Sequence, residues 1–134
     1  MIYFLDTNIC IFHLKNSCEN MSMRLKSTPI SDVRISSMVA AELLYGAEKS
    51  IKREQNLRVF KAFLSIYEIT PFDDCAAEQY ARIRTELERD GTMIGSNDLV
   101  IAATALANGG VVVTNNSGEF SRVKGLVVED WTLE

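Results

Sequence analysis

Three acidic residues stand where a folded chain could bring them to one site. Asp6 directly follows the apolar run Ile2–Leu5, Glu42 lies inside the apolar stretch 39–44, and Asp98 opens a later helix-like segment. Carboxylates held together raise each other's pKa values unless a cation neutralises them. Oxygen ligands without a Cys or His cluster suit Mg²⁺ or Mn²⁺, which can activate water and stabilise charge on a phosphoryl oxygen. This combination favours phosphodiester hydrolysis.

Each of these acids also has an ordinary structural interpretation. Asp6 could cap a helix that begins near Asn8, and Asp98 could stand in the cap or first turn of its own helix, where acids favour the helix dipole. Glu42 could lie on a narrow solvent-facing stripe. If it were buried without a partner instead, its carboxylate would destabilise the fold or become protonated.

The elements that must position the acids alternate between strand and helix patterns. Apolar, β-branched runs predict strands, and amphipathic spacing with capping residues predicts helices. The predicted strands are 2–5, 32–37, 67–72, 111–114 and 126–131, and the predicted helices are 8–15, 17–27, 38–50, 51–66, 73–90 and 96–106. Ser96 or Asn97 is the expected cap of the last helix.

This alternation predicts an α/β fold in which a central, mostly parallel sheet is flanked by helices, an α/β/α sandwich. Without repeats or linker-like segments, residues 1–134 are expected to form a single domain. Functional crevices of such sheets lie at the carboxyl ends of the strands. Asp6 is placed at one such end and Thr114–Asn116 at another.

Composition narrows the choice of partners. The 134 residues have a formal net charge of -4 and a pI of about 5.1, which is unusual for a protein that binds nucleic acid by bulk electrostatics. Any nucleic-acid role must rest on a local site. Two groups of basic residues occur, most simply as solvated helix faces; they are Lys49, Lys52, Arg53, Arg58 and Lys61, and Arg82, Arg84 and Arg89.

Several cofactors and compartments are disfavoured. Three cysteines without CxxC spacing argue against a disulfide framework or a zinc ribbon. Nucleotide-binding glycine motifs and HExxH are missing from the sequence. His13 is the only histidine and lies in an apolar-flanked segment, which argues against a nucleophilic triad that requires histidine. Apolar runs fall short of the ~20 residues that cross a bilayer, so we expect a cytoplasmic protein without membrane association.

Four segments together resemble PIN-domain ribonucleases, and most closely the VapC toxins of bacterial toxin–antitoxin pairs. They are "FLDTNICIF", "AAELLYGAEKS", "IGSNDLVIAATAL" and "VVVTNNSGEFSRVKGLVVEDW", in this order and spanning nearly the whole chain. The resemblance implies a PIN fold with Mg²⁺- or Mn²⁺-dependent endoribonuclease activity.

The resemblance also implies roles for individual residues. Asp6, Glu42 and Asp98 become the catalytic carboxylates, with Asp6 and Asp98 as direct metal ligands. Many PIN domains carry a fourth acid at the position held here by Asn116. Asn116 is therefore expected as a site neighbour, which weakens the case for a second tightly bound metal. Supporting roles are expected for Thr7, Asn8, Thr114 and Glu119, the last as a possible nearby carboxylate.

Partners and substrate follow from the same resemblance. It implies RNA cleavage that inhibits translation, with the anticodon loop of initiator tRNA as a known target class. It also implies a cognate VapB-type antitoxin that covers the active site, and toxin dimers that build larger complexes.

Three other functions compete with this interpretation. The same acidic pocket serves metal-dependent nucleases that act on DNA or flaps. A phosphoacceptor domain would add a lysine after a late strand, which "VVVTNN" does not supply. A non-catalytic interaction module would bind its partner equally well after Asp98→Asn.

Overall fold

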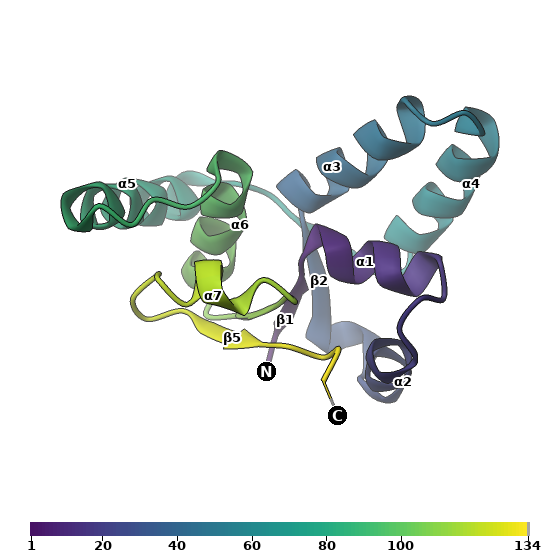
Figure 1. Cartoon of the computed structure of the whole chain (residues 1–134), viewed down its shortest axis with the longest axis horizontal. Coiled ribbons are helices and arrows are strands. Elements are labelled where there is room, and N and C mark those ends of the chain that lie inside the picture. Colours follow the sequence, from purple (N-terminus) through teal and green to yellow (C-terminus); the bar gives the residue numbers. More distant parts are fainter. Residues whose placement is uncertain (134) are drawn as a thin grey trace.

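The computed structural model of the chain describes residues 1–133. The predicted alternation of strands and helices is confirmed, with strand and helix ends close to those expected (Figure 1). The elements are β1 Tyr3–Leu5, α1 Thr7–Leu14, α2 Glu19–Ser27, the 3₁₀ turn η1 Ile30–Asp32, β2 Val33–Ser36, α3 Ser37–Glu48, α4 Arg53–Leu64, β3 Glu68–Thr70, α5 Asp74–Asp90, α6 Ser96–Ala107, β4 Val111–Val113, α7 Ser117–Phe120 and β5 Val127–Glu129.

The five strands form one sheet in the order β3-β2-β1-β4-β5, and every pair is parallel. The chain therefore builds outward from β1 in one direction through β2 and β3, and later in the other direction through β4 and β5. The reversal between β1 and β4 is the topological switch point, where ligands bind in open parallel sheets. Leu5 pairs with Val113 at this point, so both strands end level with each other.

The central strands are buried on both faces. Phe4, Leu5, Val112 and Val113 are fully inaccessible to solvent, as expected for parallel strands covered by helices. A close approach at the start of β4 requires glycine, because a Cβ added at Gly110 would lie 2.6 Å from the Phe4 ring. The core thus fixes the positions of β1 and β4.

Two pairs of closely packed helices, α3 with α4 and α5 with α6, lie at opposite ends of the molecule. Figure 1 shows α3 and α4 as a hairpin projecting at one end, and α5 crossing α6 at the other. Asp73 caps α5 by accepting a hydrogen bond from the Ala76 amide (3.0 Å), and Gly91 ends it with φ of 67°. Both features agree with the sequence pattern.

One expectation about local structure was wrong. Gly95, rather than Ser96 or Asn97, is the N-cap of α6, and no side-chain hydrogen bond caps this helix. Asn97 is inside the helix, and its side chain points to Glu42 instead. The short helix α7 was not expected, because four residues carry about one helical turn and no readable periodicity.

Within residues 1–133, no helix combines the length and apolar character needed to cross a bilayer. The cysteines Cys10, Cys18 and Cys75 are all free thiols, as their spacing predicted.

Candidate functional site

Asp6 is the innermost acid of the candidate site. It follows β1, its amide donates to the Val113 carbonyl (2.9 Å), and its side chain is only 5% exposed. Carboxylate Oδ1 accepts from the Thr7 amide (2.7 Å), and Oδ2 accepts from the Thr114 hydroxyl (2.8 Å). Asp6 therefore caps α1, and its side chain also reaches across the switch point to the end of β4. Its placement is compatible both with the capping interpretation and with a place in an acidic site.

The environment of Asp6 disfavours its charged form. Burial raises the pKa of this carboxyl above its usual value, although the bonds from Thr114 and Thr7 oppose the rise. The negative charges of Glu42 and Glu119 raise the pKa further. Three acidic side chains from separate elements therefore act on one another across this end of the sheet.

Glu42 is held in place by donors from two other helices. The Thr7 hydroxyl of α1 donates to Oε1 (2.7 Å), and the Asn97 amide of α6 donates to Oε2 (3.3 Å). Glu42 is half-buried on α3. It is thus neither an isolated buried charge nor a freely solvated side chain, because its two oxygens join α1, α3 and α6 at the candidate site.

We call the four carboxylates of Asp6, Glu42, Asp98 and Glu119 the acidic cluster, of which Asp98 and Glu119 form the outer part. Burial, followed by the charges of Asp6 and Glu119, raises the pKa of Asp98 to about 7, and a hydrogen bond to Glu119 adds to the rise. The pKa of Glu119 is lowered, chiefly because its carboxylate accepts from the Gly95 amide. The two carboxyl groups therefore influence each other's ionisation.

Asn116 and Thr114 order the segment that carries Glu119. The Asn116 amide nitrogen donates to the Thr114 hydroxyl (2.9 Å), and its side-chain Nδ2 donates to Glu119 Oε2 (2.6 Å). Asn116 therefore contacts Glu119, and Glu119 supplies the carboxylate beside Asp98. Asn8 is exposed on α1, and none of the hydrogen bonds within residues 1–133 joins its side chain to the cluster.

From the sequence, Glu119 was expected only as a possible nearby carboxylate, whereas in the structure it interacts directly with Asp98. This residue is far from Asp98 along the chain, and the short helix α7 brings it back across the end of β4. The sequence feature that could have indicated its role is its position three residues after Asn116, which is one helical turn away.

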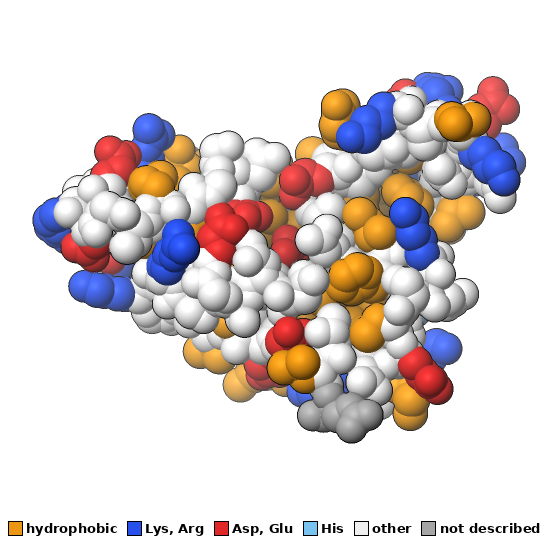
Figure 2. Space-filling view, in the orientation of Figure 1, with side chains coloured by type: hydrophobic (Ala, Val, Ile, Leu, Met, Phe, Trp, Pro, Cys, Tyr) orange, Lys and Arg blue, Asp and Glu red, His pale blue; other side chains and the backbone are white. Residues whose placement is uncertain are grey.

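The donor set of the acidic cluster fits a hard divalent cation. Figure 2 shows acidic side chains gathered where α3 approaches α6 and α7. None of the ion pairs within residues 1–133 neutralises a member of the cluster. No group of three or more acidic, His or Cys side chains in that part of the chain is arranged to hold a metal ion. The cluster supplies only oxygen donors, and Mg²⁺ needs no more than one or two carboxylates because it keeps several waters.

The chain is similar over nearly its whole length to proteins named as nucleases. Residues 3–126 match the PIN domain. The tRNA(fMet)-specific endonuclease VapC of Salmonella typhimurium is 46% identical over 129 residues, covering 96% of this chain and 97% of that protein. Ribonuclease VapC2 of Rickettsia felis is 44% identical over 135 residues, covering 98% of both. The crystal structure of DNA-bound VapBC from Salmonella typhimurium contains a chain that superposes with a TM-score of 0.92 at 45% identity, covering 98% of both chains.

Proposed function

This chain belongs to the PIN-domain family and, within it, to the VapC ribonucleases, and on that premise we propose that it is a Mg²⁺- or Mn²⁺-dependent endoribonuclease. The observation that carries the proposal is the convergence of four carboxylates from separate elements on the switch point between β1 and β4. Such a cluster suits a cation-assisted reaction at a phosphodiester far better than it suits a structural role, because the acids disfavour one another's charge.

The metal would be held by Asp6 and Asp98. When bound, Mg²⁺ or Mn²⁺ supplies positive charge to the scissile phosphate and makes water a better nucleophile. The raised pKa of Asp98 supports this assignment, because a carboxyl that titrates near neutral pH in the free protein becomes fully ionised when a cation replaces its proton.

We assign Asp6, Glu42, Asp98 and Asn116 to the catalytic set. Neighbouring residues keep the carboxylates of this set in position. Thr7 and Thr114 orient Glu42 and Asp6 through the hydrogen bonds described above, and burial of Asp6 and Thr114 excludes water from the inner end of the site.

Two further residues support the set. Glu119 is fixed by Asn116 and by the Gly95 amide, so its charge stays beside Asp98. Asn8 lies exposed on the first turn of α1, where it is available to a bound substrate rather than to the acids.

We propose tRNA as the substrate, cut in the anticodon loop of the initiator species. A relative 46% identical to this chain is named a tRNA(fMet)-specific endonuclease, which supports this choice. Cleavage of initiator tRNA would stop translation, so the chain would act as the toxin of a type II toxin–antitoxin module in the cytoplasm.

We also propose a VapB-type antitoxin as its partner, with toxin dimers inside a larger complex. The support is the similarity to a chain of a solved VapBC complex over 98% of both chains. In this assembly the antitoxin would keep RNA away from the acidic cluster.

The test is cleavage of labelled nucleic acid by the purified chain, freed from any co-purifying partner. Initiator tRNA, elongator tRNA and a DNA hairpin of the anticodon sequence are incubated separately with Mg²⁺, Mn²⁺ or EDTA. We expect discrete, metal-dependent cuts in initiator tRNA alone. Equal cleavage of the DNA hairpin would favour a DNA nuclease, and intact substrates in all arms would contradict a catalytic function.

A further inference from the structure

A groove of about 530 Å³ runs from the acidic cluster along α3. Thr7, Glu42 and Asn97 belong both to this groove and to the hydrogen bonds of the candidate site. Tyr45 and Lys49 line the same groove further along α3. A ligand that reached the acids could therefore extend along α3 without leaving the groove.

Two residues of α3 and its C-cap, Lys49, share one side of the helix. Glu42, Tyr45 and Lys49 are separated by three and four residues, which is the spacing of neighbours on a helical face. The distance along the helix axis from the first to the last is about 10 Å at 1.5 Å per residue. This matches the rise of about three stacked nucleotides at roughly 3.4 Å each.

Tyr45 and Lys49 form an accessible pair of an aromatic ring and a cation. The Tyr45 residue is 64% exposed, and Lys49 Nζ lies 4.7 Å from the centre of its ring. Lys49 takes part in none of the ion pairs within residues 1–133. The ring is free to stack on a nucleic-acid base, and the ammonium group is free to contact a phosphate.

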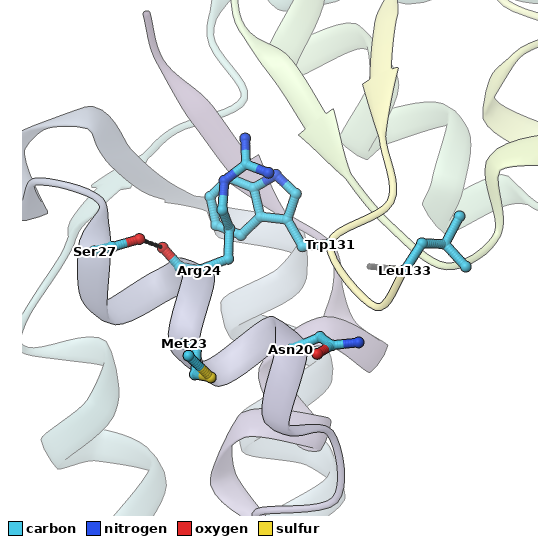
Figure 3. A pocket seen from close by; sticks show the side chains of 6 residues that line it. All are labelled: Asn20, Met23, Arg24, Ser27, Trp131 and Leu133. Atoms are coloured by element: carbon cyan, nitrogen blue, oxygen red, sulfur yellow. Dashed lines mark hydrogen bonds between the residues drawn. The ribbon is translucent and has the colours of Figure 1, made fainter.

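A second aromatic–cation pair, Trp131 with Arg24, has neither an accessible ring nor a cation without an ion-pair partner. Figure 3 shows Arg24 lying over Trp131, with 4.9 Å between the guanidinium carbon and the ring centre. Trp131 is only 2% exposed, and Arg24 is paired with Glu129 at 3.2 Å. The aromatic ring is therefore covered and the cation neutralised, so this pair serves packing.

The α3–α4 hairpin is also locally basic in an acidic chain. Residues 45–61 contain five Lys and Arg residues and two Glu residues, whereas the whole chain has a net charge of -4. Figure 2 shows Lys and Arg side chains gathered at the projecting end of this hairpin. The charge at this end is complementary to a nucleic-acid backbone, which the acidic cluster alone would repel.

We propose that this groove binds the single-stranded RNA next to the cleaved phosphate, with Tyr45 stacking on a base and Lys49 contacting a phosphate. The proposal rests on the ribonuclease function above and identifies residues that bind its substrate. The apolar groove walls, which include Ile11, Met38 and Ala41, cover the faces of the bases, which are themselves weakly polar.

The experiment compares Tyr45→Ala, Tyr45→Phe and Lys49→Gln with Lys26→Gln, a matched change of an exposed lysine on α2. Each variant is made in the active chain, for kcat and KM on tRNA, and in the Asp98→Asn chain, for binding of a fluorescent single-stranded RNA without cleavage. Circular dichroism checks folding, which Tyr45→Ala should leave intact because the side chain is exposed.

We expect Tyr45→Ala to raise KM and Kd about ten-fold while kcat changes little, and Tyr45→Phe to restore both constants. Lys49→Gln should reduce the slope of log K against log salt by about 0.7, the value for one phosphate contact on a single strand. Lys26→Gln should match the unmodified chain in every assay.

Several results would overturn the proposal. Unchanged RNA binding by folded Tyr45→Ala and Lys49→Gln in the Asp98→Asn chain would exclude the groove, even if the active chain cleaves RNA. Unchanged RNA binding with weaker binding of a co-expressed antitoxin would make the groove a protein-docking site. If the active chain cleaves nothing, the proposed function fails, and RNA binding by the Asp98→Asn series still decides whether the groove holds RNA.

Discussion

The Thr114 hydroxyl donates a 2.8 Å hydrogen bond to Asp6 Oδ2, which ties together the ends of two neighbouring strands 108 positions apart in the chain. Both side chains are buried, and Thr114 accepts in turn from the Asn116 amide. This contact couples the position of the innermost carboxylate to the segment that delivers Glu119. Asp6 is thereby held in place at the inner end of the site.

Replacing Thr114 by valine should therefore weaken both the fold and the activity. The substitution keeps the shape of the side chain but removes the donor to Asp6, so we expect the free energy of unfolding to fall by about 2 kcal/mol. Thr114→Ser, which keeps the hydroxyl, should recover most of the loss. Urea denaturation measures the change, and equal stabilities of the valine and serine variants would contradict this role of the hydroxyl.

The stability of the metal-free protein should depend on pH through Asp98. Its pKa is about 7 in the folded chain and near 3.8 when unfolded, so between about pH 4 and pH 7 the folded state holds a proton that the unfolded state has lost. Stability from this group therefore falls as pH rises through that window. Glu119 has a lowered pKa and contributes in the opposite sense, but only below its ordinary value of 4.5.

Asp98→Asn should flatten this dependence. In EDTA, we expect the unmodified chain to lose more stability between about pH 5 and about pH 8 than the variant does, because the asparagine cannot ionise. Urea denaturation at both pH values gives the comparison. Parallel losses in the two proteins would show that Asp98 is not the group that titrates in this range.

Divalent metal should stabilise the chain through the acidic cluster. At about 100 times its Kd, a bound ion adds roughly 2.7 kcal/mol to the free energy of unfolding. Thermal denaturation should show a higher Tm in Mg²⁺ or Mn²⁺ than in KCl of equal ionic strength. Asp98→Asn should lose most of this increase, whereas an equal increase in the variant would argue against Asp98 as a ligand.

Glu119 should influence the pH dependence of cleavage. Its charge and its hydrogen bond both raise the pKa of Asp98, so Glu119→Gln should shift the acid limb of the pH–rate profile to lower pH. The matched control is Glu78→Gln, which changes an exposed acid on α5. An acid limb that stays in place would separate Glu119 from the ionisation of Asp98.

The strands and most helices could be predicted because their residues are locally consistent. Buried β-branched runs such as Val111–Val113 have few alternatives, and Asp73 and Gly91 mark the two ends of α5 as clearly as any pattern in the chain. The order of the strands in the sheet could not be predicted from local sequence patterns. It depends on which apolar faces pack together after collapse, and the sequence pattern implies only that the sheet is parallel.

The acidic cluster was predictable in part for the same reason. Asp6 follows a strand, and parallel strands end at one edge, so its placement followed from the fold class. The closeness of Glu119 to Asp98 depends on a four-residue helix and on the Gly95 amide, neither of which leaves a periodic signal. The partners of Glu42 were also hidden, since Thr7 and Asn97 reach it from helices distant in the chain.

The most direct test of the acidic cluster is single-turnover cleavage of end-labelled initiator tRNA by the unmodified chain and by Asp98→Asn, in Mg²⁺ and with matched amounts of folded protein. Loss of even a supporting group at a metal site commonly costs 10–100-fold in activity, so we expect a decrease of at least roughly 100-fold, with no cleavage in EDTA. Cleavage by Asp98→Asn at the unmodified rate would contradict the assignment of the acidic cluster as the active site.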